Sequence, residues 1–151
     1  AYKMITDERY PSYAHWIARG ATALFENFRP DWAAPASLNH HFWGDISAWF
    51  IKCIAGIQLS RSKDGAAALK IKPAFIEALD DASAFHHAPE GTVAVSWKRE
   101  NREIALDVKI PEGISATLEL PAQYCIIKGS HAKTAVSGTY RIARTEENGK
   151  E

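Results

Sequence analysis

The sequence lacks several features that would assign it to a functional class. Its 18 basic residues are balanced by 18 acidic ones, giving a formal net charge of +0. A nucleic-acid-binding face usually brings a basic excess, so no nucleic-acid partner is expected. No apolar run approaches the roughly 20 residues that span a bilayer. The longest, 46–57, is interrupted by Lys52 and Gly56, and therefore predicts a buried helix and no membrane partner.

Cysteine is also scarce. Cys53 and Cys125 lie far apart, and neither belongs to a Cys-x-x-Cys pair or another ligand-spaced set. Two buried free thiols are predicted, because free cysteine packs as a small hydrophobe; a disulfide is the alternative. A glycine-rich phosphate loop, a Gly-x-Ser-x-Gly elbow and a Walker pattern are missing as well. No cofactor or metal is expected, and the cellular compartment stays open.

The length of 151 residues allows one ordinary domain or two small ones. The chain begins at Ala1 without an initiator methionine and without a charged-then-apolar leader. It is therefore predicted to be a piece of a longer protein. A change in residue periodicity near residue 60 predicts two parts, 1–60 and 61–151.

The first part has a helical pattern. Tyr13, Trp16 and Ile17 recur at i, i+3 and i+4, which predicts a helix over 11–19 that stops at Gly20.

A second helix is predicted over 41–55, capped by Ser37 or Asn39 and ended by the glycine that follows. Residues 21–28 are expected to be extended, and 29–36, with two prolines, to form a loop. The apolar arc of the second helix is wide, which is typical of a helix packed on several sides.

The second part has period two. A polar linker is predicted over 59–65, and beyond it apolar residues alternate with polar ones between short turns. This pattern is typical of an antiparallel β-sandwich. The fold class is therefore α+β. The predicted strands are 69–71, 93–97, 104–110, 114–120, 124–127 and 139–143.

Glu26 is the first candidate for chemistry. It is flanked by Phe25 and Phe28, which are expected to desolvate the carboxylate partly and so raise its pKa for acid–base work. The alternative is a surface glutamate in a loop, or an ion-pair partner of Arg29.

The pair His40-His41 is the second candidate. Next to a carboxylate, a histidine can orient it or bind a sugar hydroxyl. A metal site shared with His86-His87 is a weaker hypothesis, because no ligand set with zinc spacing is present. The default alternative is one histidine in the core and one in solvent.

Tryptophan is abundant near these residues. Trp32 and Trp43 could stack on the apolar face of a pyranose ring, whereas core packing is the simpler interpretation, above all for Trp49. A carboxylate, an imidazole and aromatic rings together are what a sugar-handling pocket needs.

These residues also form ordered motifs. They are Tyr10-Pro11-Ser12-Tyr13, Gly20-Ala21-Thr22-Ala23-Leu24-Phe25-Glu26-Asn27-Phe28, Ser37-Leu38-Asn39-His40-His41-Phe42-Trp43-Gly44 and Ala55-Gly56-Ile57. In order and spacing they resemble the C-terminal end of bacterial α-L-rhamnosidases, which carry Gly-Ala-Thr-Thr-x-Trp-Glu-x-Trp and Ser-x-Asn-His-x-x-x-Gly. Residues 66 to about 121 resemble the β-sandwich that follows the catalytic barrel there.

The resemblance implies a fold and an activity. Residues 1–60 would be the last helices of an α/α barrel, and 61–151 the C-terminal sandwich, of an inverting glycosidase of terminal α-L-rhamnosides. The motif places the general base on Glu26 and a sugar-pocket histidine on His40, with Phe25, Trp32 and Trp43 as further substrate-binding candidates. The general acid is expected outside this chain, so the chain alone should be inactive.

The motif also differs from the family pattern. Phe25 and Phe28 stand where the family has tryptophan, and Asn27 where it has arginine, so the sugar and aglycone stay open. The parent would be bacterial, with a periplasmic or secreted location as options.

Two other functions compete with the enzyme. One is a non-catalytic carbohydrate-binding or interaction sandwich. The other is a scaffold that self-associates through an exposed helical face with Trp16, Phe42 or Trp49. Rhamnose-containing glycosides or polysaccharides are the expected partners of the glycosidase. Homo-oligomerisation through the exposed helical face is expected in each case.

Overall fold

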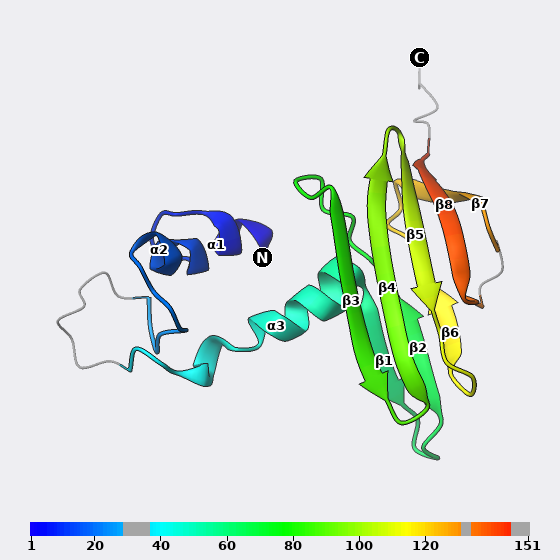
Figure 1. Cartoon of the computed structure of the whole chain (residues 1–151), viewed down its shortest axis with the longest axis horizontal. Coiled ribbons are helices and arrows are strands. Elements are labelled where there is room, and N and C mark those ends of the chain that lie inside the picture. The colour runs from blue at the N-terminus through cyan, green and yellow to red at the C-terminus, as the bar shows by residue number, and fades with distance from the viewer. Residues whose placement is uncertain (29–36, 131–133, 146–151) are drawn as a thin grey trace. The chain divides into compact units, whose positions relative to one another are not determined.

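A computed structural model describes residues 1–28, 37–130 and 134–145 of the chain (Figure 1). By its internal contacts the chain divides into two compact units, residues 1–48 and 49–151. They are called here the helical unit and the sandwich unit. The sequence boundary proposed at residue 60 lies inside the sandwich unit, because Ile54 and Ile57 belong to the core of that unit.

The helical unit contains the short helices α1 (Tyr2–Thr6) and α2 (Tyr13–Ala18). Helix α2 falls within the predicted range 11–19, and Gly20, with φ +84°, follows its end as predicted. Its Trp16 is 2% exposed and stacks on Phe28, with the ring centroids 4.1 Å apart. The periodicity therefore identified the helical face that forms the core of this unit.

Ser12 holds the start of α2. It is 1% exposed, accepts a hydrogen bond from the His15 N–H at 2.8 Å and donates one to the Asp7 carbonyl.

We expect Ser12→Ala to lower the free energy of unfolding by about 1–2 kcal/mol, since the cap and a buried bond are both lost. Urea unfolding measures this. The exposed Ser47→Ala should change it by less than about 0.5 kcal/mol, and equal losses would contradict the cap.

The predicted helix over 41–55 is broken. A 3₁₀ turn at His41–Trp43 is followed by α3 (Ile46–Trp49) and by a π-helical segment, η2 (Phe50–Ala55), which ends at Gly56 with φ +87°. Gly44 lies at the break and is a poor helix former. None of the described helices is long and apolar enough to cross a bilayer.

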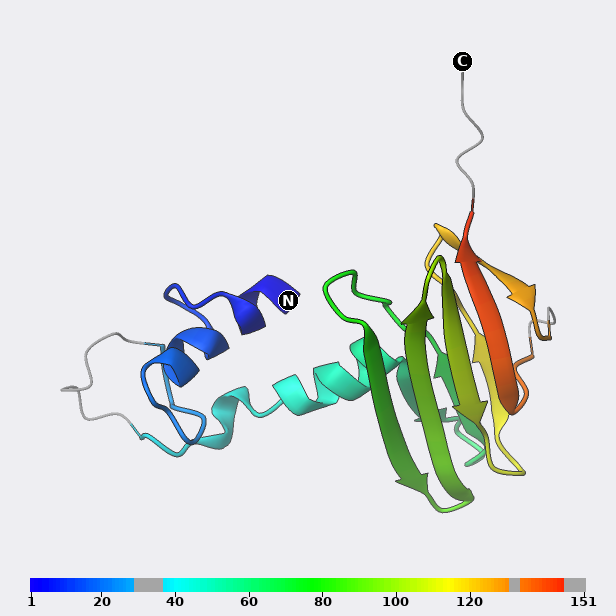
Figure 2. The same cartoon turned by 45° about the horizontal axis from the view of Figure 1, so that its top comes forward.

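The sandwich unit has two sheets (Figure 2). A three-stranded sheet has the order β1-β2-β6, and a five-stranded sheet has the order β3-β4-β5-β8-β7. All pairings are antiparallel except the parallel pair β2–β6. The strands are β1 (Ile57–Arg61), β2 (Ala67–Ile71), β3 (Asp81–Ala88), β4 (Gly91–Glu100), β5 (Glu103–Lys109), β6 (Ser115–Leu118), β7 (Tyr124–Lys128) and β8 (Gly138–Arg144).

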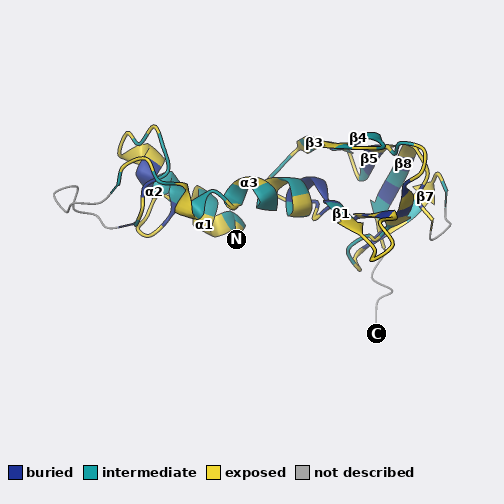
Figure 3. Ribbon diagram, turned by 90° about the horizontal axis from the view of Figure 1, so that it is seen from below, coloured by how far each residue is buried: buried dark blue, intermediate teal, exposed yellow. Residues whose placement is uncertain are grey.

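The core lies between the two sheets, where Figure 3 shows the buried residues of the strands. Ile71 of one sheet and Leu106 and Ile142 of the other are fully buried. Trp97, 1% exposed, donates its indole N–H to the Ile54 carbonyl at 3.0 Å. This bond fixes η2 to the five-stranded sheet and satisfies a buried polar group.

The six predicted strands are confirmed, but two strands were not predicted. The predicted linker 59–65 is wrong in its first half, because β1 occupies Ile57–Arg61. Strand β3, an edge strand, carries Ala, Ser and His in place of branched apolar residues, so its period is weak. The thiols are free as predicted, but Cys53 is half-buried and Cys125 exposed, so their predicted burial is wrong.

Candidate functional site

The two candidate residues lie on segments that pair with each other within the helical unit. The Glu26 N–H donates to the Ser37 carbonyl at 2.9 Å, and the His40 N–H donates to the Leu24 carbonyl at 2.8 Å. These two backbone bonds run in antiparallel fashion, since the residue numbers on one segment rise as those on the other fall. Glu26 and His40, 14 positions apart in the sequence, are thereby brought onto neighbouring stretches.

The Glu26 side chain is held by a backbone donor. Its Oε2 accepts a hydrogen bond from the Ser37 N–H at 2.9 Å. The side chain is exposed, so the expectation that Phe25 and Phe28 desolvate it is wrong for this chain. Successive side chains of an extended segment point to opposite sides. Phe25 accordingly lies in the core of the unit while the adjacent carboxylate faces outward. Phe28, two residues on, also reaches the core because the chain bends at Glu26.

His40 caps the 3₁₀ turn at His41–Trp43, whereas Ser37 or Asn39 was predicted as the cap of a helix here. The His40 Nδ1 accepts a hydrogen bond from the Phe42 N–H at 3.2 Å. A neutral imidazole that accepts at Nδ1 carries its proton on Nε2. The backbone therefore fixes the tautomer, and Nε2–H is the group that His40 can offer to an oxygen of a ligand. The His41 ring stacks on His40 with the centroids 5.3 Å apart.

The aromatic candidates differ in their exposure. Phe25 is 8% exposed and packs against Trp16, so most of its ring is used by the core. Trp43 is half-buried, lies 5.0 Å from Phe28 between ring centroids, and donates its indole N–H to the Glu26 carbonyl at 3.1 Å. Trp32 lies outside the described residues.

Tyr13 supports the same segment from α2. Its hydroxyl donates to the Trp43 carbonyl at 3.1 Å. Burial raises the pKa of the Tyr13 phenol, and the nearby negative charge of Asp45 raises it further, so the group remains a donor at neutral pH. Neither Tyr13 nor the indole bond of Trp43 was predicted as part of the site. Their polar contacts go to backbone atoms, which side-chain spacing does not reveal.

A hollow of about 320 Å³ lies beside this site, lined by Tyr13, Trp16, Ile17 and residues 21–24. It reaches Leu24 but neither Glu26 nor His40 lines it. A larger hollow, of about 660 Å³, belongs to the sandwich unit. Among the described residues no group of three or more His, Cys, Asp or Glu side chains is placed to hold a metal ion.

The predicted self-association face needs a correction. Trp16 is buried in the core of the helical unit and cannot contact another chain. Phe42 and Ile17 are 67% and 70% exposed, so apolar surface does remain on this unit. Large exposed apolar side chains of this kind can mark a region that another part of a protein covers.

A carboxylate and an imidazole held on paired segments, among aromatic rings, define a candidate carbohydrate-processing site. Comparison with family models agrees with this class. Residues 1–54 match the six-hairpin glycosidase domain of bacterial α-L-rhamnosidases, and residues 56–133 match the bacterial α-L-rhamnosidase C-terminal domain. The chain belongs to the bacterial α-L-rhamnosidase family and corresponds to its C-terminal region, with the end of the helical barrel followed by the β-sandwich.

Individual relatives give the same result. An α-L-rhamnosidase of Formosa agariphila is 33% identical over 127 residues, covering 80% of this chain and 14% of that protein. One of Alteromonas sp. (strain LOR) is 32% identical over 143 residues, covering 87% of this chain and 15% of that protein. The chain thus spans about one seventh of the length of these curated relatives.

Solved structures share the fold. The α-L-rhamnosidase from Dictyoglumus thermophilum superposes with a TM-score of 0.75 at 21% identity, covering 95% of this chain and 18% of that one. The Streptomyces avermitilis α-L-rhamnosidase, solved with L-rhamnose, gives 0.70 at 21% identity over 95% of this chain and 15% of that one.

Proposed function

We propose that this chain is part of an inverting glycoside hydrolase that removes terminal α-L-rhamnosyl groups. The segment before Gly56 would supply the end of the catalytic barrel, and the strands from β1 onward the C-terminal sandwich. The observation that carries the proposal is the pairing that places the carboxylate of Glu26 beside the His40 segment. Membership of the family supports it.

Glu26 is proposed as the general base. Inversion requires a carboxylate to activate a water molecule on one face of the sugar while an acid protonates the leaving oxygen from the other. The two carboxyl groups of such enzymes stand about 6.5–9.5 Å apart. The Ser37 N–H occupies Oε2 of Glu26 and fixes the plane of the carboxylate, which leaves Oε1 to take the proton of the water.

His40, Trp43, Phe25 and Trp32 are proposed to position the sugar. With its proton on Nε2, His40 can donate a hydrogen bond to a sugar hydroxyl. Trp43 can present the exposed part of its ring to the apolar face of the sugar, while Phe25 supports the segment from the core side. For Trp32 the proposal depends only on its place in the sequence.

The proposal that this chain supplies the general base but not the general acid can be tested directly. We expect the purified 151-residue chain to show no hydrolysis of p-nitrophenyl α-L-rhamnoside, because it contributes the base but not the acid on the opposite face. Joined to the preceding helices of a six-hairpin barrel, which this chain would complete, the same residues should hydrolyse it and release β-L-rhamnose first. Proton NMR of the fresh product distinguishes the anomers. Activity of the isolated chain, or α-L-rhamnose as the first product, would contradict the proposal.

A further inference from the structure

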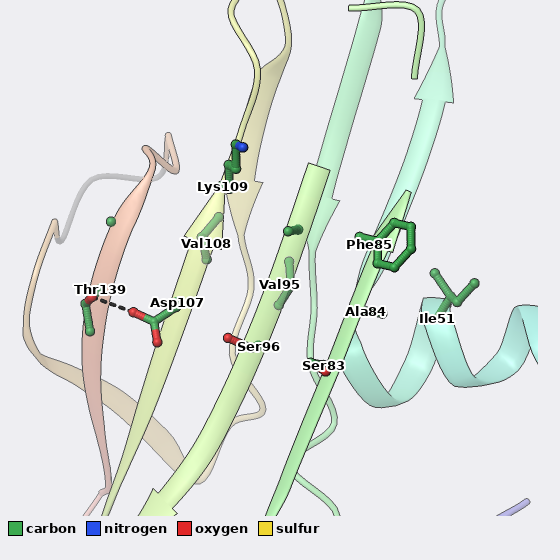
Figure 4. A pocket seen from close by; sticks show the side chains of 12 residues that line it. Ile51, Ser83, Ala84, Phe85, Val95, Ser96, Asp107, Val108, Lys109 and Thr139 are labelled. Atoms are coloured by element: carbon green, nitrogen blue, oxygen red, sulfur yellow. Dashed lines mark hydrogen bonds between the residues drawn. The ribbon is translucent and has the colours of Figure 1, made fainter. Parts of the chain in front are cut away.

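The outer face of the five-stranded sheet carries a hollow that the proposed catalytic function does not use. Its volume is about 660 Å³, within the range of about 300–1,000 Å³ typical of small-molecule sites. All of its lining residues belong to the sandwich unit, from η2, β3, β4, β5 and β8. Figure 4 shows the labelled side chains of this surface, which we call the sheet hollow.

Strand register builds the sheet hollow. Ser83, Ser96, Asp107 and Thr139 lie opposite one another across β3, β4, β5 and β8, and therefore form one row. A second row, two positions along β3, β4 and β5, consists of Phe85, Ala94 and Lys109. Ser83, Ser96 and Ala94 have small side chains. They therefore leave a depression in the outer face of the sheet between the larger side chains of Phe85, Asp107 and Lys109. The intervening Val95 and Val108 point into the core.

One end of the sheet hollow is polar. The Thr139 hydroxyl donates to Oδ1 of Asp107, a bond drawn in Figure 4. A carboxylate can accept about four hydrogen bonds, so Asp107 keeps acceptor capacity after this one. Lys109, two residues further along the same strand and also exposed, adds up to three donors. Adjacent acceptors and donors of this kind suit two neighbouring hydroxyl groups.

The other end is apolar. Phe85 is 62% exposed, and its ring lies at the β3 side of the sheet hollow, where Ile51 of η2 also contributes to the lining (Figure 4). The Phe85 ring is supported by His87, with centroids 5.1 Å apart, and the His87 Nδ1 lies 2.9 Å from the Thr92 hydroxyl. An exposed, buttressed aromatic ring offers a flat apolar surface at low entropic cost.

We propose that the sheet hollow binds a neutral pyranoside that has a diol on one edge and a methyl group on the other, as a 6-deoxyhexose does. The C–H face of the ring would lie over Phe85, the methyl group toward Ile51, and the diol toward Asp107 and Lys109. A fully hydroxylated hexose would place its 6-hydroxyl against the apolar end and lose a hydrogen bond to water there. The sandwich would then hold a rhamnosyl group without cleaving it.

This inference extends the proposed function but does not depend on Glu26. Binding is therefore to be measured on the chain itself and on its Glu26→Gln variant, where it should be unchanged. If rhamnoside hydrolysis is never found but binding is, only the proposed catalytic function fails. If hydrolysis is found and binding is not, only the sheet hollow fails.

The experiment is an NMR titration of the ¹⁵N-labelled 151-residue chain. With methyl α-L-rhamnopyranoside we expect saturable shifts of β3, β4 and β5 amides, and binding at least about fivefold weaker for methyl α-L-mannopyranoside, which adds only the 6-hydroxyl. Because the hollow is open, affinity near the ~1 mM scale is expected. No saturable shift up to about 100 mM, far above that scale, or shifts that follow protein concentration instead of sugar, would overturn the proposal.

Matched variants locate the site. Phe85→Ala should weaken binding at least about tenfold, as expected for loss of a stacking ring, and Asp107→Asn should weaken it several-fold. The controls are Ile127→Ala, an apolar side chain 47% exposed on β7, and Asp81→Asn, an exposed carboxylate on β3. Both lie outside the lining and should bind as the unchanged chain does. Binding that survives Phe85→Ala in a folded protein would exclude this site.

Discussion

Replacing Glu26 by Gln is expected to lower kcat for aryl α-L-rhamnosides by about 10²- to 10⁴-fold in a protein in which this chain completes a barrel begun by the preceding helices. The amide keeps the shape of the side chain but cannot take a proton from water. KM should change little, because the group acts on the water molecule and not on the bound sugar. Steady-state kinetics with p-nitrophenyl α-L-rhamnoside measures both constants.

A second variant separates a lost base from a damaged fold. Glu26→Ala removes the carboxylate and leaves space, so added azide should restore release of p-nitrophenol and form β-L-rhamnosyl azide, the inverted product. Glu112→Gln, an exposed carboxylate in the turn between β5 and β6, is the matched control and should keep full activity. A Glu26→Gln enzyme with nearly unchanged kcat would remove Glu26 from the mechanism.

The sandwich was largely predictable because one face of each sheet is dry. In β2 the buried residues Ala67, Leu69 and Ile71 alternate with exposed ones. This period of two is visible in the residue types of the later strands as well. Strand β3 has half-buried Ala82 and Ala84 opposite Trp97 and Val95 of its neighbour β4, and the exposed His86 opposite Val93. The parallel pair β2–β6 was not predictable, since register between strands distant in sequence is a property of the whole fold.

The site was predictable in part, and from motifs more than from composition. The motifs named Glu26 and His40, and the structure places them on paired segments. What the sequence could not provide are the partners, because Ser37 and Phe42 contribute backbone N–H groups. The expectation that the neighbouring phenyl rings bury Glu26 failed for a simple reason. Phe25 is the immediate neighbour of Glu26 and lies on the opposite side of the extended segment, and a bend at Glu26 turns Phe28 toward the core as well.

The sheet hollow gave no signal in the sequence. It depends on Ser83, Ser96 and Asp107, from three strands, falling in one row. A shift of one residue in either pairing would move one of these side chains to the core face. Such a surface can be recognised only after register is known.

Gly56 is the residue at which the largest loss of stability is expected. It joins η2 to β1 and is the first residue of the family match 56–133, just after the match 1–54 ends. Its φ is +87°, and a Cβ atom there would lie 2.3 Å from the Pro73 nitrogen and 2.4 Å from the Lys72 carbonyl carbon. Both are backbone atoms that cannot rotate away, and the Lys72 N–H donates to the Gly56 carbonyl at 2.8 Å.

Gly65 is a natural control, because its φ is +88° but no atom lies within 4 Å of the Cβ position. Gly65→Ala should therefore cost only the strain of a left-handed alanine, about 1–2 kcal/mol. Gly56→Ala adds a backbone clash to the same strain, for which we expect about 3 kcal/mol more, at the upper end of the cost of overpacking. Urea unfolding followed by the fluorescence of the buried Trp97 measures both. The left-handed strain is common to the two variants. Equal losses of unfolding free energy would therefore show that Gly56 does not lie in close contact with the backbone of Lys72 and Pro73.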